Sequence, residues 1–131
     1  MSTVFERIVR GEIPAYKVAE TEDYLAFLDI RPLTRGHTLA IPKKPIDYIL
    51  DLDEELYVGL WLFAREVARA VQSAVSCERI AFAVVGLEVP HAHIHIVPIR
   101  TMADLNFQNP RLDLSPEEFR SIAEAIQAKL R

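Results

Sequence analysis

Cysteine is almost absent from this sequence, which contains Cys77 as its one thiol. A single thiol cannot close an internal disulfide, so a disulfide-stapled secreted domain is excluded and a reducing compartment, the cytoplasm, is expected. We interpret Cys77 as a small apolar side chain at the end of a helix rather than as a reactive group.

Long hydrophobic runs and a strong excess of one charge are missing as well. No apolar run approaches the 18 or so residues that span a membrane, and the first residues lack the pattern of a signal peptide. The net charge of -4 argues against a nucleic-acid groove, although a small nucleotide needs only local donors for its phosphates. The expected partners therefore include neither membrane nor nucleic acid.

The chain does contain enough apolar material for one folded domain. Half of its 131 residues are hydrophobic, which is typical of a single domain with a real core. The patterns predict helices over residues 4–10, from Asp51 or Asp53 to about residue 76, and from residue 116 onward. They predict strands over residues 17–20, 24–30, 37–42, 80–85 and 91–97. Together these elements predict an α+β fold with a five-stranded antiparallel sheet.

The chemistry is concentrated in residues 89–98. Histidines alternate there with small or apolar residues, which is typical of a strand whose alternate side chains share one face. His91, His93 and His95 are therefore expected on one face, opposite an apolar face that packs into the core. Neighbouring histidines on a strand start about 6.6 Å apart, so three cannot easily converge on one metal ion. The row suits an elongated anionic ligand, with one histidine as nucleophile; a histidine-rich surface strand is the structural alternative.

Several ordered motifs resemble the histidine triad (HIT) family. Residues 91–97 match its pattern of three histidines separated by apolar residues. Residues 3–15, 26–32 and 36–44 resemble the opening helix, the ribose-binding strand end and the strand with a fourth histidine in the Hint-like branch. The resemblance implies a single HIT domain over residues 1–131, with a core over 1–100 and a C-terminal extension with a helix over 101–131.

The resemblance also implies an activity and partners. It implies a homodimer whose two sheets join into ten strands, and a nucleotidyl hydrolase or transferase without a required cofactor; zinc is possible but not indicated. The expected ligand is a purine nucleotide such as AMP, released from a phosphoramidate or a related conjugate through a nucleotidyl-histidine.

Particular residues carry these implied roles. His93 is the implied nucleophile, His95 and His91 contact the phosphate and fix the tautomer of His93, and His37 extends their network. Attack needs a neutral imidazole, so activity should fall below roughly pH 6.5. The implied nucleotide contacts are Phe5, Ile8, Ile13, Phe27, Asp29, Ile30 and Glu88. Core packing and, for Asp29, loop capping are the alternatives to these roles.

The loop before the triad departs from the family. Hint-like and Fhit-like members carry an Asn and a Gly-Gln pair followed by Ser or Thr, whereas residues 84–90 are short and place Glu88 near that position. Glu88 is either a group that tunes the leaving group or an exposed turn carboxylate. Three functions stay open: a nucleoside phosphoramidase-like hydrolase, a dinucleoside polyphosphate hydrolase as in the Fhit branch, and a nucleotide- or zinc-binding module that uses His37 with two triad histidines.

Two further expectations concern packing. Ser115, Pro116 and Glu118 are typical of a helix start, and the apolar residues after them predict a helix that docks on the body of the dimer. These residues are Phe119, Ile122, Ile126 and Leu130. Trp61 lies off the apolar stripe of the long helix and is expected to face a partner subunit.

Overall fold

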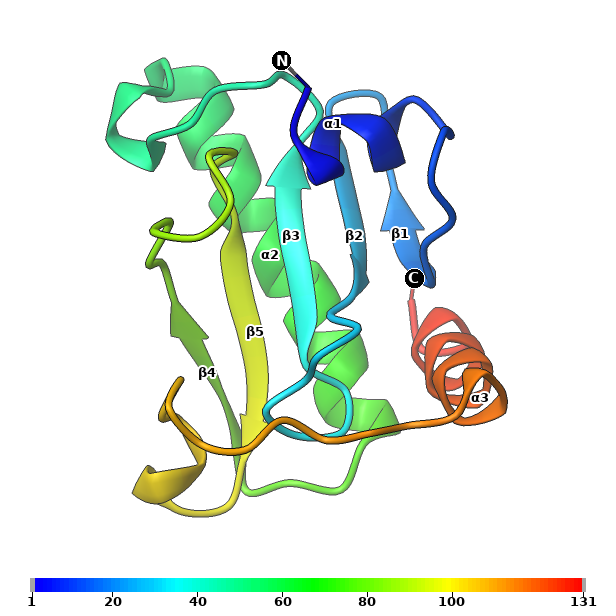
Figure 1. Cartoon of the computed structure of the whole chain (residues 1–131). Helices are drawn as coiled ribbons and strands as arrows, with labels where there is room; N and C mark the ends of the chain where they lie inside the picture. The colour runs from blue at the N-terminus through cyan, green and yellow to red at the C-terminus, as the bar shows by residue number, and fades with distance from the viewer. Residues whose placement is uncertain (1, 131) are drawn as a thin grey trace.

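A computed structural model describes residues 2–130, whose strands form one antiparallel sheet in the order β1-β2-β3-β5-β4 (Figure 1). The strands are β1 Lys17–Glu20, β2 Tyr24–Leu28, β3 Thr38–Pro42, β4 Arg79–Ala83 and β5 Ile94–Ile99. The helices are α1 Val4–Val9, α2 Glu54–Ala74 and α3 Pro116–Gln127, with 3-10 turns η1 Ile49–Asp51 and η2 Met102–Asp104. The predicted α+β fold with a five-stranded antiparallel sheet is confirmed.

Each main helix begins at a side-chain cap. The hydroxyls of Thr3 and Ser115 accept the N–H groups of Glu6 and Glu118 in reciprocal capping boxes. The carboxylate of Asp53 accepts the N–H of Leu56 and starts α2. None of the helices in residues 2–130 is long and apolar enough to cross a membrane.

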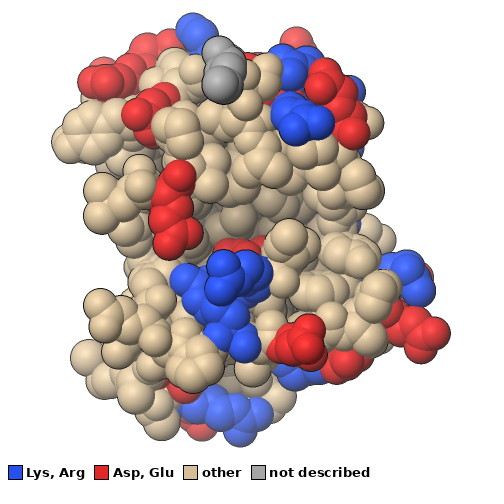
Figure 2. Space-filling view, in the orientation of Figure 1, with Lys and Arg blue, Asp and Glu red and all other residues tan. Residues whose placement is uncertain are grey.

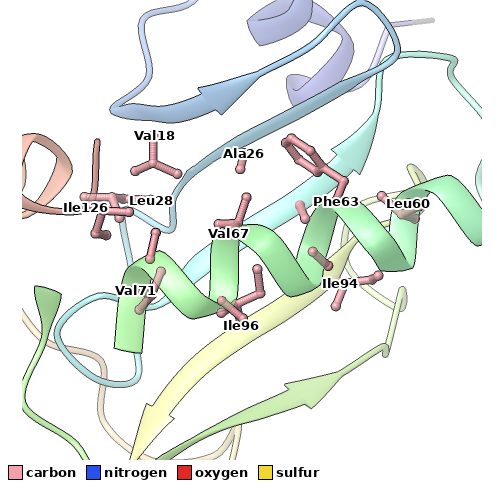
Figure 3. Packing of buried hydrophobic residues seen from close by; sticks show 14 of the residues in the cluster. Val18, Ala26, Leu28, Leu60, Phe63, Val67, Val71, Ile94, Ile96 and Ile126 are labelled. Carbon is pink, nitrogen blue, oxygen red and sulfur yellow. The ribbon is translucent and has the colours of Figure 1, made fainter. Parts of the chain in front are cut away.

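The larger core lies between the sheet and α2 (Figure 3). Ile94 and Ile96 of β5 are fully buried there against the apolar face of α2, as the alternating pattern predicts. The C-terminal helix closes the same core, because Phe119, Ile122 and Ile126 belong to this cluster. The helix therefore docks on the body of its own chain, as expected, and its place in a dimer stays a prediction.

A smaller core lies under α1, next to the triad histidines. Phe5 and Ile8 of α1 pack on side chains from the sheet. These are Leu25 and Phe27 of β2 and Leu39 and Ile41 of β3. This core holds α1 against the sheet, with Phe5 next to the triad.

The triad does not form one continuous strand, and this part of the prediction is wrong. β3 pairs with β5 only from Thr38–Ile96 to Ala40–Ile94, so His95 is the one triad histidine within the strand. If the same register continued, Pro42 of β3 would stand opposite Ala92. Pro42 has no N–H, so it cannot donate a hydrogen bond to the neighbouring strand. The N–H of Ala92 instead donates to the carbonyl of Ile46 at 2.7 Å.

Candidate active site

A cavity of about 570 Å³ opens beside the triad, and we call it the histidine cavity. Its walls come from α1, the end of β2, β3, the loop over residues 85–89, the triad and residues 107–111. Six of the residues expected in the site line this cavity. They are Phe5, Asp29, Ile30, Glu88, His93 and His95.

His93 is held in one tautomer by the backbone. Its Nδ1 lies 2.6 Å from the carbonyl oxygen of His91, and a carbonyl can only accept, so Nδ1 carries the proton. Nε2 of the neutral ring therefore keeps a free lone pair. The ring lies edge-on to Phe5, with centroids 5.1 Å apart, which limits its rotation. His93 lines the histidine cavity, and its ring has a fixed orientation with Nε2 available as a nucleophile.

A hydrogen-bond relay fixes the tautomer of His95. The N–H of Leu33 donates to Nδ1 of His37 at 3.0 Å, so the proton of neutral His37 sits on Nε2. That nitrogen lies 3.0 Å from Nδ1 of His95 and donates to it. His95 must then carry its own proton on Nε2, where it can donate to a ligand. His37 acts on the site through His95 and does not line the cavity.

His91 lies outside the cavity, so the structure does not bring its side chain to the phosphate position. The ring is fully buried, and Nε2 donates to the carbonyl of Pro42 at 2.8 Å. His91 still fixes the tautomer of His93, as expected, but through its main-chain carbonyl and not through its ring.

Three expected nucleotide contacts lie behind the cavity wall. Ile8 and Phe27 are buried in the smaller core, and Ile13 packs against that core. The ring of Phe5 contacts Phe27 edge-on at 5.4 Å and covers the core on the cavity side. Ile8, Ile13 and Phe27 therefore support Phe5 rather than line the cavity themselves.

Asp29 is a constrained carboxylate at the end of β2. Its Oδ1 accepts the N–H of Arg31 at 2.8 Å, and its own N–H donates to the carbonyl of His37 at 3.0 Å. Burial raises the pKa of this carboxyl, while the Arg31 N–H and the positive charge of Arg111 oppose the rise. The arrangement leaves Oδ2 as an acceptor at the cavity, 3.7 Å from Nε2 of His37.

One wall of the cavity was missed in the sequence. Residues 107–111 return to the site from the irregular segment after β5. The ring of Phe107 lies edge-on to His95, with centroids 4.7 Å apart, and Arg111 follows on the same wall. The segment has no periodic pattern, so nothing in its sequence indicates that it folds back.

The family model for the HIT domain matches residues 10–102. The chain belongs to the HIT family. Among its relatives is the adenosine 5'-monophosphoramidase hnt1 of Schizosaccharomyces pombe, which is 34% identical over an alignment of 137 positions that covers the whole of both chains. Protein hit of Bacillus subtilis is 33% identical, over 97% of this chain and 93% of its own. These relatives are consistent with the Hint-like branch.

Solved HIT structures share the whole fold of this HIT domain. A Hit-like protein from Bartonella henselae superimposes with a TM-score of 0.86 at 31% identity, over 98% of this chain and 96% of its own. A zinc-bound histidine triad protein from Mycobacterium smegmatis gives 0.82 at 34% identity, over 98% and 95%. The likeness thus extends through the C-terminal helix, beyond the residues matched by the family model.

One group in residues 2–130 could hold a metal ion in this HIT protein. Asp29, His37 and His95 each offer one ligand atom, and these atoms lie within 4.8 Å of one another. The group includes one triad histidine and not the expected two. A metal ion there would have to replace the proton shared by His37 and His95, and would break the relay.

The histidines of the site resist protonation. Burial lowers the pKa of His37 and of His95 to about 3, with the neighbouring histidines and Arg111 adding to the effect. Burial also lowers the pKa of His93. Neutral His93 therefore persists below pH 6.5, and the acidic limit of any activity that needs it should lie lower than the sequence suggests.

The same shifts predict acid sensitivity of the fold. Unfolded histidines bind protons near pH 6.5, whereas folded His37 and His95 do so only near pH 3. Their contribution to stability is complete above pH 6.5 and is lost as the pH falls toward 3. We expect the free energy of unfolding to drop by roughly 2 kcal/mol for each histidine between pH 7.5 and 5.

Urea denaturation at several pH values measures this drop. His37→Asn offers a control, because an amide oxygen can still accept the Leu33 N–H but the side chain cannot take up a proton. The variant should show a shallower dependence on pH. Equal free energies of unfolding at pH 7.5 and 5 for the wild type would contradict the assignment of neutral, buried imidazoles.

Proposed function

We propose that this HIT protein is a nucleotide-binding hydrolase of the nucleoside phosphoramidase type. The observation that carries the proposal is the 2.6 Å contact between Nδ1 of His93 and the carbonyl of His91, which leaves Nε2 free as a nucleophile. In the first step Nε2 attacks the α-phosphorus, the bond to the leaving nitrogen breaks, and a nucleotidyl-histidine forms. Water then attacks the same phosphorus, displaces His93 and releases the nucleoside monophosphate. No metal cofactor is required for these steps.

We propose that the cavity binds a purine nucleotide such as AMP. Asp29 offers a carboxylate that can accept both ribose hydroxyls, and Phe5 and Ile30 offer apolar surface for the base. Nε2–H of His95 is placed to donate to a phosphate oxygen that becomes more negative during attack. The 34% identity to a protein named adenosine 5'-monophosphoramidase supports the same substrate class.

Glu88 is an acidic side chain in the loop before the triad. It lines the cavity, and its negative charge acts on His93. We propose that the carboxylate faces the leaving group, where it attracts an amine or supplies it with a proton. A leaving group that is itself a phosphate would be repelled by the same charge, so amine-leaving substrates should be preferred.

Comparison of substrates tests the proposed function. We expect a higher kcat/KM for a fluorogenic AMP phosphoramidate than for diadenosine polyphosphates. We expect Glu88→Gln to lower the ratio of the first kcat/KM to the second. A preference of the wild type for diadenosine polyphosphates would instead support a Fhit-type hydrolase. Binding of AMP without turnover of either substrate would overturn the hydrolase proposal.

Zinc binding is the second candidate function, and the cluster of Asp29, His37 and His95 favours it. Equilibrium dialysis against zinc tests it directly. Stoichiometric binding that disappears in His37→Asn and inhibits turnover would establish this site as a zinc site. Turnover that requires added zinc would contradict the metal-independent mechanism.

We also propose that two copies form a homodimer through β4 and the outer side of α2. β4 is an edge strand, and apolar side chains surround a shallow hollow beside it. These are Tyr57, Val58, Trp61, Leu62 and Phe82. Pairing of β4 with its copy would join two sheets into ten strands and cover this apolar surface.

Leu62→Glu tests the dimer. Leu62 is half-exposed, so a charge should leave the monomer folded but prevent burial of the apolar surface. We expect light scattering to give a dimer mass for the wild type and a monomer mass for the variant. Ser73→Glu, with the same new charge on an exposed position of α2, should remain a dimer. A monomeric wild type would contradict the proposal.

A further inference from the structure

The wall formed by residues 107–111 brings a cation to the histidine cavity. The segment crosses the sheet between η2 and α3 (Figure 1) and lies beyond residues 10–102, which the HIT family model matches. Leu112 fixes its end, because its N–H donates to the carbonyl of Pro32 at 2.9 Å. Arg111 therefore reaches the cavity from a segment outside the residues that the HIT family model matches.

The side chain of Arg111 is held in one orientation, but most of its hydrogen-bond donors are unused. Nη1 donates to the carbonyl of Arg31 at 2.7 Å, and the guanidinium lies over the ring of Phe107 at 5.7 Å. Nη2 lies 3.5 Å from the carbonyl of Phe107, which is long for a hydrogen bond. A guanidinium has five N–H donors, so most of them have no partner among residues 2–130.

The charge of Arg111 has no close counter-ion either. Among residues 2–130, no carboxylate oxygen lies within 4.0 Å of its nitrogens. Its charge lowers the pKa of His37 and of His95 and opposes the raised pKa of Asp29, so it acts on the groups at and behind the cavity. Figure 2 shows basic side chains gathered at the centre of this face, beside a hollow.

The cavity needs such a cation. Glu88 and Asp29 both line it, and two carboxylates disfavour an anionic ligand unless positive charges compensate for them. The cations that line the cavity are Arg31 and Arg111, and the Arg31 side chain belongs to an exposed residue, whereas Arg111 is held by Phe107 and by the carbonyl of Arg31. The hydrogen bonds of the histidines assign them no charge, because Nδ1 of His95 accepts the Nε2–H of His37, and the contact of Nδ1 of His93 with the carbonyl of His91 leaves a lone pair on Nε2 of His93. Phe107 connects Arg111 to His95, because the guanidinium lies over its ring and the same ring lies edge-on to His95, with centroids 4.7 Å apart.

We propose that Arg111 binds the phosphate of the nucleotide together with Nε2–H of His95. The inference rests on the nucleotide site proposed above and adds a specificity-determining residue to it. Arg111 then selects nucleotides over nucleosides, and residues 107–111 are part of the site rather than a linker to α3. The competing explanation is that Arg111 only holds this segment to Arg31.

Calorimetric titration with AMP and with adenosine separates the two explanations. We expect Arg111→Gln to weaken AMP binding by about 10- to 100-fold and to leave adenosine binding within about twofold. Arg111→Lys should recover part of the AMP affinity, since it keeps the charge but loses the forked geometry. Arg35→Gln is the matched control: Arg35 is exposed, pairs with Glu118 at 2.9 Å, and should affect neither ligand.

Other results overturn the proposal. Equal losses of AMP and adenosine affinity in both Arg111 variants would show a structural role, and unchanged AMP affinity would show no role. The hydrolase proposal can fail separately, through AMP binding without turnover by the wild type, and the titration still tests Arg111 in that case.

Discussion

His93→Ala should lower turnover of an AMP phosphoramidate by roughly 10³-fold or more, because it removes the only atom that forms the covalent intermediate. Binding of AMP should change little, since Asp29, Phe5 and Arg111 supply the remaining contacts. Single-turnover kinetics and calorimetry measure the two quantities separately.

His91→Gln is the matched control for this loss. The His91 ring is buried outside the cavity, and an amide N–H can replace its hydrogen bond to the carbonyl of Pro42. We expect lower stability but turnover close to that of the wild type. Turnover by His93→Ala close to that of the wild type would show that His93 is not the nucleophile.

Deletion of residues 113–131 should abolish cooperative folding. Phe119 stacks on Tyr16 with ring centroids 4.9 Å apart, and Ile122 and Ile126 are buried in the larger core. Each of these side chains contributes about 1.5–3 kcal/mol when fully buried. Their sum is comparable to the roughly 5–15 kcal/mol by which a domain is stable. Circular dichroism and urea denaturation should show no cooperative transition.

A point substitution measures the contribution of α3 packing to stability without removing the helix. Ile126 is fully buried, so Ile126→Ala should lower the free energy of unfolding by about 2–5 kcal/mol. Glu124→Ala, at an exposed position of α3, should change it by less than about 0.5 kcal/mol. A cooperative transition in the truncated chain at the wild-type urea midpoint would mean that α3 does not stabilise the core.

The fold was predictable where local patterns and burial agree. Caps such as Ser115 with Glu118 mark helix starts, and the alternation of Ile94 and Ile96 marks a core-facing strand. The boundary of the triad strand was not predictable from alternation alone, because it depends on Pro42, which stands on another strand. A missing N–H on the partner ends the ladder whatever the local sequence favours.

The site was predictable for residues near the recognised motifs and not for those brought in by tertiary contacts. His93, His95, Asp29 and Glu88 line the cavity as expected. Ile8 and Phe27 were expected to line the cavity but lie in the smaller core behind it, because sequence position does not show that Phe5 covers them. Residues 107–111 were missed, since a polar segment without periodicity gives no sign of where it folds.

Mass spectrometry of a rapidly quenched reaction tests the central claim, that His93 becomes a nucleotidyl-histidine. We expect one AMP group on the peptide that contains residues 91–95, attached at His93 and absent from His93→Ala. No adduct under conditions that trap a fast intermediate, together with wild-type turnover by His93→Ala, would contradict it.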